Sequence, residues 1–427
     1  MDPLTYLFGL EHFGIKFGLD NMRAIVAALG HPERTFRSVH IGGTNGKGSV
    51  TAMVDAGLRA AGHRVARYTS PHLVALNERF VVDGRAVDDD TMVAAIASVR
   101  DVVEALRRDG ALEVHPTFFE VTTAVAFEIF RRASVELAVV EVGLGGRLDA
   151  TNVIIPEACA ITSIDFDHEQ YLGSSLGVIA WEKAGILKPG VPVVLGGLDP
   201  EAAARIEEVA NEIGAPIVRT SASDLGERAV GLSGQHQRGN AAVALGLLEV
   251  LNRRGITVPP AAVDAALLET HWPGRLDLRR LPDGRELLMD AAHNPAGAAA
   301  LAQYLRAQPG PSLPLVFAAM RDKNIVGMFR ALLPAVASLT LTRATSPRSA
   351  EPDGLAQAAR EIAPSLEIAV ERSLPAALDG AWRAALTARH AAPPVSSHPV
   401  SSPPARIVVA GSIFLLGDVM QQLGLHW

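Results

Sequence analysis

The stretch Gly42-Gly43-Thr44-Asn45-Gly46-Lys47-Gly48-Ser49 decides the fold class. An apolar segment at residues 36–41, which we expect to be a buried strand, precedes it, and a predicted helix follows from about residue 48 to 61. Glycines let backbone N–H groups close around a phosphate, and the helix N-terminus adds positive potential. This context predicts a phosphate loop in which Lys47 reaches the β- and γ-phosphates and Ser49 holds Mg²⁺. An ordinary glycine-rich turn is the alternative.

Strands and helices are predicted to alternate over the first 270 or so residues. Residues 65–69 are predicted to be a second strand, and residues 137–142 and 158–164 are short apolar runs typical of central strands in a parallel sheet. Residues 91–108 carry apolar side chains at helical spacing. Such alternation predicts an α/β domain whose ligand site lies at the carboxyl ends of the strands.

The alternation restarts after Trp272-Pro273-Gly274-Arg275, which predicts a second domain. Residues 1–274 would form the ATP-binding domain and residues 275–427 a smaller, Rossmann-like α/β domain. Pro- and Ser-rich residues 391–405 are predicted to be a mobile surface loop. The candidate strands of the second domain are residues 287–290, 314–319, 339–341, 366–370 and 406–410.

Composition limits the class of protein. The formal charge of −7 argues against a general nucleic-acid binder, which needs a positive face. The single cysteine, Cys159, fits a reducing compartment, and the N-terminus lacks the pattern of a signal peptide. No apolar run approaches the roughly 20 residues needed to cross a bilayer. We therefore expect a cytoplasmic protein with neither membrane nor nucleic-acid partners.

Lysine is rare in this chain. The 39 basic residues include only five lysines, which are Lys16, Lys47, Lys183, Lys188 and Lys323. Arginine's guanidinium is not a usable nucleophile, whereas a lysine amine is. A lysine retained among arginines therefore invites a chemical explanation, although chance is the alternative.

Glu141, His168 and Lys183 are further candidates. Glu141 ends an apolar strand ahead of a Gly-rich turn, where a carboxylate can reach Mg²⁺ at a nucleotide site. Taken singly, these residues could be a solvated strand-end acid, a turn histidine and an exposed helix lysine. Asn294-Pro295 is predicted to begin a helix, with asparagine as the N-cap.

The segment GTNGKGS resembles the ATP loop of the Mur ligase superfamily, and within it the folylpolyglutamate synthase/dihydrofolate synthase family. Other segments match that family in order along nearly the whole chain. They are residues 68–73 with Glu78-Arg79, EVGLGGRLDATN at 141–152, Asp167-His168, EKAGI at 182–186, His236-Gln237 with Asn240, Pro273-Gly274-Arg275, and DAAHNP at 290–295. The resemblance implies an α/β fold with a P-loop-containing Mur-ligase-type central domain followed by the smaller Rossmann-like domain.

The resemblance also implies site residues. ATP is then bound by Gly43, Thr44, Asn45, Gly46, Lys47, Gly48, Ser49, Asn240, Arg275, Asp290 and His293. Two Mg²⁺ ions are held by Ser49, Ser70, Glu141, His168 and a carbamylated Lys183. Substrate is bound by Ser70, Pro71, His72 and Arg79, and the catalytic residues are Lys47, Glu141, His168 and Lys183. Apart from the resemblance, Arg321-Asp322-Lys323 follows a predicted strand and is either a plain charged turn or a substrate site, in which Lys323 helps to hold the carboxylates of the incoming amino acid.

The implied reaction is ATP-dependent ligation of L-glutamate to dihydropteroate, to the tail of reduced folates, or to both, through an acyl phosphate, by a monomeric enzyme. Residues 116–120, PTFFE, resemble the bacterial pattern and favour both activities. The alternatives are a monofunctional folylpolyglutamate synthase, another Mur-type acid–amino acid ligase, and a non-enzymatic ATP-binding regulatory protein. A cell-wall precursor ligase would need a sugar-nucleotide-binding domain ahead of Gly42, where only about 40 residues are available.

Overall fold

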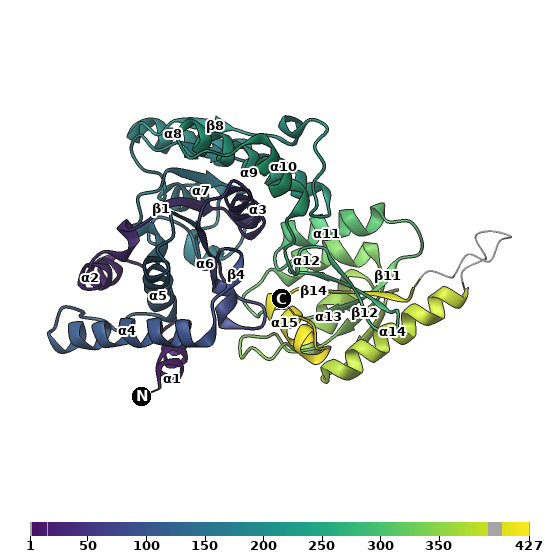
Figure 1. The fold of residues 1–427 in the computed structure, drawn as a ribbon. Helices are drawn as coiled ribbons and strands as arrows, with labels where there is room; N and C mark the ends of the chain where they lie inside the picture. Colours follow the sequence, from purple (N-terminus) through teal and green to yellow (C-terminus); the bar gives the residue numbers. More distant parts are fainter. Residues whose placement is uncertain (1, 15, 392–403, 427) are drawn as a thin grey trace. The chain divides into compact units, whose positions relative to one another are not determined.

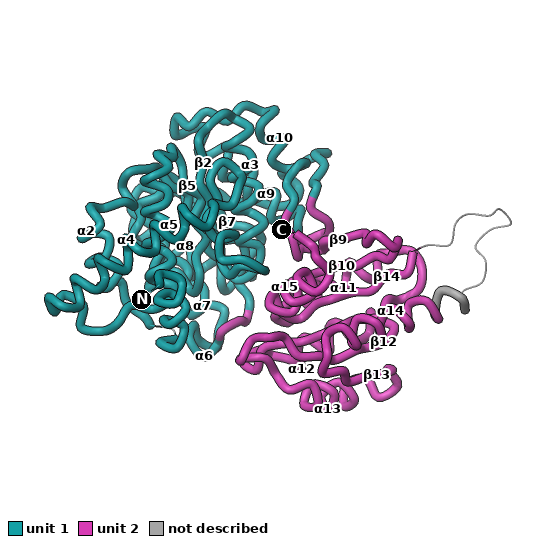
Figure 2. The backbone as a smooth tube through the Cα atoms, turned by 60° about the horizontal axis from the view of Figure 1, so that its bottom comes forward, with its two compact units in different colours: residues 1–165, 169–231, 237–271 teal, residues 166–168, 232–236, 272–427 magenta. Residues whose placement is uncertain are grey.

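The structure, a computed structural model, describes residues 2–14, 16–391 and 404–426 (Figure 1). Most of the predicted mobile loop therefore lies outside the described residues. The chain divides into two compact units (Figure 2). Unit 1 comprises residues 1–165, 169–231 and 237–271, and unit 2 comprises residues 166–168, 232–236 and 272–427. Unit 2 thus includes three short segments that were predicted to belong to the first domain, which are residues 166–168, 232–236 and 272–274.

Unit 1 contains an eight-stranded mixed sheet in the order β4-β3-β2-β5-β1-β6-β7-β8. All neighbouring pairs from β2 to β8 are parallel, whereas β3 pairs antiparallel with both β2 and β4. The strands are β1 (Arg37–Gly42), β2 (Val65–Tyr68), β3 (Phe80–Val82), β4 (Arg85–Ala86), β5 (Leu137–Glu141), β6 (Ala158–Ile161), β7 (Val193–Leu195) and β8 (Ile217–Arg219).

Helices connect these strands, as expected of an α/β domain. They are α1 (Pro3–Phe8), α2 (Asp20–Ala28), α3 (Lys47–Ala60), α4 (Asp89–Arg108), α5 (Phe118–Arg132), α6 (Glu169–Leu172), α7 (Leu176–Ala184), α8 (Pro200–Ile213), α9 (Gln235–Arg253) and α10 (Pro260–Glu269). The 3₁₀ turns in this part of the chain are η1 (Gly9–Phe13), η2 (Pro32–Arg34), η3 (Leu76–Arg79), η4 (Ala150–Val153) and η5 (Ala222–Leu225).

The central strands confirm the prediction from the apolar runs. β1, β5 and β6 are almost entirely buried, as expected of strands covered on both faces. β1 lies between β5 and β6, so the three carboxyl ends lie side by side. The β3–β4 hairpin was not predicted; its turn, Asp83-Gly84, has positive φ at both residues, a conformation typical of tight hairpins.

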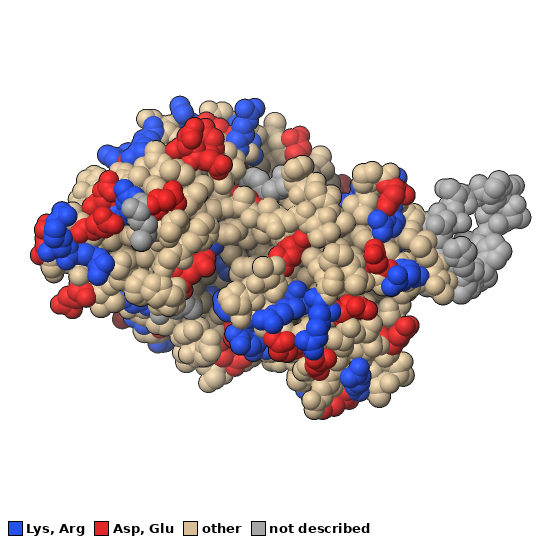
Figure 3. All heavy atoms as spheres, turned by 90° about the horizontal axis from the view of Figure 1, so that it is seen from below, with Lys and Arg blue, Asp and Glu red and all other residues tan. Residues whose placement is uncertain are grey.

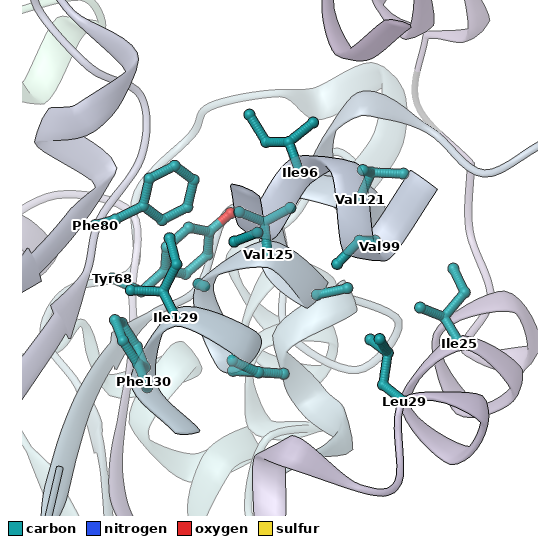
Figure 4. Close-up of a cluster of buried hydrophobic side chains, with 14 of the residues drawn as sticks. Ile25, Leu29, Tyr68, Phe80, Ile96, Val99, Val121, Val125, Ile129 and Phe130 are labelled. Carbon is teal, nitrogen blue, oxygen red and sulfur yellow. The ribbon is translucent and has the colours of Figure 1, made fainter. Parts of the chain in front are cut away.

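Helix α5 packs against β2 and β3 of this sheet, and α4 packs on α5. Side chains of Val121, Val125 and Ile129 on α5 pack in a continuous apolar cluster with Tyr68 and with residues of α4 (Figure 4). The Tyr68 ring stacks on Phe80 with ring centroids 6.0 Å apart. This packing holds the β2 end of the sheet rigid, next to the segment that follows β2.

Unit 2 contains a six-stranded sheet in the order β13-β12-β11-β14-β10-β9, parallel except for β9. Its strands are β9 (Asp277–Arg280), β10 (Glu286–Asp290), β11 (Leu313–Phe317), β12 (Val336–Leu341), β13 (Glu367–Val370) and β14 (Arg406–Ala410). Its helical elements are α11 (Pro295–Ala307), α12 (Ile325–Leu332), η6 (Leu333–Ala335), α13 (Pro352–Ile362), α14 (Leu374–Ala391) and α15 (Ile413–Gln422). All the strands predicted for the second domain are present, and β9 is a further strand that was not predicted.

The predicted start of α11 is confirmed. Asn294 is its N-cap and accepts a hydrogen bond from Gly297 N–H, and Pro295 is the first helical residue. Within the described residues, no helix has both the length and the apolar character needed to cross a membrane. Positive and negative side chains are interspersed on the face shown in Figure 3, without a broad basic area.

Candidate active site

The phosphate loop lies between β1 and α3, and its glycines are required by geometry. Gly46 precedes the helix with φ of 86°, in the left-handed region that favours glycine. Gly43 has φ of 141°, and a Cβ there would lie 2.0 Å from Thr162 Oγ1. The Thr162 hydroxyl itself donates to the carbonyl of Asn45 at 2.6 Å. The loop is therefore held against the segment that follows β6.

That segment contains residues that the sequence analysis did not select. Ser163 Oγ accepts a hydrogen bond from Asn45 N–H at 2.9 Å, and Thr44 Oγ1 donates to Asp165 O at 3.2 Å. β6 ends at Ile161, earlier than predicted, because Thr162 and Ser163 turn their hydroxyls toward the loop. The signal was present, since polar residues follow an apolar strand, but only the strand order shows that this strand neighbours β1.

Lys47 and Ser49 occupy the first turn of α3. Lys47 Nζ folds back over the loop and donates to Gly43 O at 3.0 Å and Thr44 O at 3.1 Å. Ser49 is 1% exposed, and its Oγ is a buried hydroxyl with no hydrogen-bond partner in the described part of the chain. A buried oxygen of this kind suits a hard cation such as Mg²⁺, so Ser49 fits the predicted ligand role.

Lys183 lies on α7 and is brought to the phosphate loop from 140 residues away. Its Nζ is buried and donates to Gly43 O at 3.0 Å. The turn at residues 143–147, GLGGR, is bonded to α7 through Arg147. Its N–H donates to Glu182 O at 2.8 Å, and its side chain pairs with the Glu182 carboxylate, also at 2.8 Å. The Arg147 guanidinium also lies 4.6 Å from the centre of the Trp181 ring. These contacts fix the lysine beside the loop.

Glu141 and Ser70 come together at the carboxyl ends of β5 and β2. Glu141, 6% exposed, accepts a hydrogen bond from Ser70 N–H at 3.3 Å through Oε2. Glu141 pairs in register with Ile41 of β1, immediately before the phosphate loop. Both oxygen-bearing side chains thus lie at the same end of the sheet as the loop.

The segment after Ser70 is organised by Glu78. This buried carboxylate accepts three backbone N–H groups, from Leu73 at 2.6 Å and from Val74 and Ala75 at 2.7 Å each. Three charge-assisted bonds to one carboxylate hold the backbone in a single conformation. The sequence analysis quoted Glu78 as part of a motif but assigned it no role.

His72 and Arg79 form a buried pair in the same segment. Arg79 Nε donates to His72 Nδ1 at 3.0 Å, so His72 must be neutral with its hydrogen on Nε2. Burial and the Arg79 charge lower the pKa of His72 to about 4. The Arg79 guanidinium also lies 5.2 Å from the centre of the Phe118 ring. Pro71 follows Ser70 through a cis peptide bond.

Asn240 lies beside the phosphate loop. A Cβ built on Gly46 would lie 2.2 Å from Asn240 Oδ1, so the amide is already in contact with the loop backbone. Asn240 Nδ2 donates to Gln237 Oε1 at 2.9 Å. The family resemblance implies that Asn240 binds ATP, and the structure places Asn240 against Gly46. Its part in ATP binding stays a prediction.

Three predicted nucleotide-binding residues, Arg275, Asp290 and His293, belong to unit 2. Asp290 accepts backbone N–H groups from Leu276 and Ala292 at 2.9 Å each, so both carboxylate oxygens stabilise local backbone. Burial raises the pKa of Asp290, against the opposing charge of Arg275. Arg275 Nη1 donates to Gly274 O at 3.2 Å.

Asp167 joins the remaining predicted residues of unit 2. Its Oδ1 accepts from Lys323 Nζ at 2.6 Å, and its Oδ2 lies 3.3 Å from His293 Nε2. Lys323 Nζ also lies 3.3 Å from His168 Nε2, which must be the acceptor because an ammonium only donates. Burial is the main cause that lowers the pKa of His168 to about 4, which agrees with a neutral ring.

The predicted metal ligands are divided between the units. Ser49, Ser70, Glu141 and Lys183 belong to unit 1, and His168 belongs to unit 2. Within the ranges that the structure describes, no three His, Cys, Asp or Glu side chains lie together as a metal site would require. The predicted ligands include two serines and a lysine, so they are not a group of three His, Cys, Asp or Glu side chains.

Comparison with known proteins finds relatives over most of the chain. Residues 274–390 match the family described as Mur ligase, glutamate ligase domain. Dihydrofolate synthase/folylpolyglutamate synthase of Bacillus subtilis is 36% identical over 356 residues, covering 78% of this chain and 82% of the relative. The Escherichia coli protein of the same name is 31% identical over 367 residues, covering 82% and 83%.

Solved structures are similar over the whole length. Mycobacterium tuberculosis folylpolyglutamate synthase, complexed with ADP and AMPPCP, has a TM-score of 0.88 at 33% identity and covers 100% of both chains. Escherichia coli FolC, in complex with DHPP and ADP, has a TM-score of 0.83 at 28% identity, covering 99% of this chain and 98% of the other. The chain therefore belongs to the folylpolyglutamate synthase/dihydrofolate synthase family.

Proposed function

We propose that this chain is an ATP-dependent ligase that joins L-glutamate to dihydropteroate and to the glutamate tail of reduced folates. The single observation that carries the proposal is the 3.0 Å hydrogen bond from Lys183 Nζ to Gly43 O, because it brings the family's distinctive lysine to the phosphate loop. Relatives named for both activities support a bifunctional enzyme. A cytoplasmic location and a monomeric state remain predictions.

The phosphate loop binds and orients ATP. The N–H groups of Thr44 and Asn45 are donated to Ser163, so the remaining backbone N–H groups of the loop and the amine of Lys47 would surround the β- and γ-phosphates in place of water. Lys47 now donates to Gly43 O and Thr44 O, so its amine already lies over the loop and needs only to exchange carbonyl acceptors for phosphate oxygens. Such preorganisation lowers the entropic cost of reaching the reactive geometry.

Magnesium fits the residues of unit 1. Ser49, Ser70 and Glu141 would hold it, and when bound it would neutralise charge on the phosphates. The buried, unpartnered Ser49 hydroxyl is the observation in favour. His168 stays a predicted ligand on the family resemblance, and its Nε2 lone pair is occupied by Lys323 in this structure.

Lys183 is proposed to carry a carbamate. Its ammonium would first lose one proton, and the free amine would then add CO₂ and release a second, which converts a buried cation into an anionic oxygen ligand. The carbamate nitrogen keeps one hydrogen, so the bond to Gly43 O can persist. Arginine could not undergo this reaction, which accounts for a lysine in an arginine-rich chain.

The substrates then react in two steps. The carboxylate of the pterin-bearing substrate, bound near residues 70–79, attacks the γ-phosphorus of ATP and releases ADP, giving an acyl phosphate. The glutamate amine attacks the acyl carbon, loses a proton, and inorganic phosphate leaves. The contribution of the protein is positioning, charge neutralisation and exclusion of water, which would hydrolyse the intermediate.

The test is ADP release by the purified protein with ATP, Mg²⁺ and glutamate, run separately with dihydropteroate and with tetrahydrofolate. Turnover with both is expected, together with the matching glutamylated product. Turnover with tetrahydrofolate alone would reduce the proposal to a monofunctional folylpolyglutamate synthase. Nucleotide binding without any glutamylated product would favour the regulatory alternative.

A further inference from the structure

Asp167 contacts four residues for which separate roles were predicted. Its two carboxylate oxygens contact Lys323 Nζ at 2.6 Å, His293 Nε2 at 3.3 Å and Asn294 Nδ2 at 3.3 Å, and Oδ1 also accepts His168 N–H at 2.9 Å. These partners come from three separate stretches of the chain. All of them belong to unit 2.

The pair with Lys323 is shielded from water, because the two side chains are each only 8% exposed. A lysine ammonium on its flexible four-carbon stem would normally extend into solvent. Here it is kept inside because a carboxylate compensates its charge. Burial by itself raises the pKa of Asp167, but the hydrogen bond from His293 and the neighbouring charges outweigh it and hold the pKa well below its usual range.

The hydrogen-bond count of Lys323 leaves one donor for a ligand. An ammonium has three N–H groups. One is directed to Asp167 Oδ1 and a second to His168 Nε2, and no acceptor for the third occurs among the described residues. Because both acceptors lie on consecutive residues of one segment, they fix the direction of the remaining N–H.

We propose that Asp167 is a positioning residue that holds the Lys323 ammonium ready to receive a carboxylate of the amino-acid co-substrate. This inference rests on the proposed function and on the expectation from the sequence that Lys323 holds a carboxylate of the incoming amino acid. Asp167 touches no substrate itself, and it acts by fixing where the lysine charge lies. The His293 ring has a second contact, from Nδ1 to Ala291 O at 2.8 Å, so its position does not depend on Asp167 alone.

The kinetic test compares Asp167→Asn with the control Asp322→Asn, which loses a neighbouring ion pair with Arg348 but leaves Lys323 and Asp167 intact. We expect Asp167→Asn to raise KM for glutamate at least about tenfold with little change in KM for ATP. In a Lys323→Met background the same substitution should add less than about twofold, since the two residues act as one unit. Equal changes in both KM values, or additive effects, would overturn the inference.

A second measurement does not depend on catalysis. Amine-labelling rates at Lys323, measured by mass spectrometry relative to Lys16, should rise by about tenfold in Asp167→Asn and stay unchanged in Asp322→Asn, because the released side chain would leave a position in which it is only 8% exposed and extend into solvent. Unchanged labelling in Asp167→Asn would refute the inference even for an inactive preparation. Absent ligation by the wild type, with the labelling difference intact, would instead refute the proposed function.

Discussion

Substitution of Gly46 by alanine tests the phosphate loop directly. Gly46 has φ of 86°, which costs an L-residue about 1–2 kcal/mol. The new Cβ would also lie 2.2 Å from Asn240 Oδ1. The Asn240 amide must then rotate and give up its 2.9 Å hydrogen bond to Gln237, a loss of about 0.5–1.5 kcal/mol.

Together these terms reach about 1.5–3.5 kcal/mol, which corresponds to an increase of about tenfold to 300-fold in the Kd for ATP. The backbone strain at residue 46 should weaken ATP binding, because the loop can relieve the strain only by leaving the left-handed conformation. Its N–H groups would then no longer converge on the phosphate. Stability should change less, since the loop can relax in the absence of nucleotide.

Isothermal titration with ADP measures the effect without requiring turnover. Gly239→Ala, one residue before Asn240 and with nothing within 4 Å of its new Cβ, is the matched control and should bind ADP like the wild type. In an Asn240→Ala background, Gly46→Ala should cost only the backbone share, about 1–2 kcal/mol. ADP binding by Gly46→Ala within about threefold of wild type, less than half the smallest cost estimated above, would refute this reasoning.

Three further outcomes are expected. Lys183→Arg should lower ligation by at least about 100-fold while ADP binding survives, because guanidinium cannot form the carbamate; a ligase as active as the wild type would argue against that role. Glu78→Gln, which keeps one acceptor oxygen but loses the bond to Leu73 N–H, should cost about 1.5–3 kcal/mol, lower Tm and raise KM for the pterin substrate but not for ATP. Glu286 is ion-paired with Arg406 and Arg280; burial raises its pKa, but these partners outweigh burial and lower it overall. The ionised Glu286 carboxylate therefore stabilises the fold fully at pH values above its ordinary pKa, and this stabilisation is lost as pH falls through the lowered pKa of the folded state. The difference in unfolding free energy between wild type and Glu286→Gln should therefore become smaller on acidification. A gap that is constant with pH would contradict the ion-pair account.

The candidate site was predictable where its chemistry is local. The phosphate loop, the strand-end position of Glu141 and the N-cap at Asn294 each follow from a few consecutive residues and their backbone preferences. Glu78 and Asp167 stand within motifs, but no local pattern predicts that Glu78 holds the backbone after Ser70 or that Asp167 binds Lys323. Each acts by accepting several hydrogen bonds, and the number of donors around a carboxylate depends on the folded backbone.

Sequence alone determined the alternation of strands and helices, the two α/β sheets and the glycine turn, because apolar periodicity and the conformational freedom of glycine are properties of neighbouring residues. Tertiary structure decided which distant residues meet. Lys183 reaches Gly43 and Asn240 reaches Gly46 only because particular elements pack beside the phosphate loop. The same holds for Lys323 at Asp167, 156 residues apart in the chain. Long-range contacts of this kind depend on the spatial order of the strands and on packing, which no local pattern encodes.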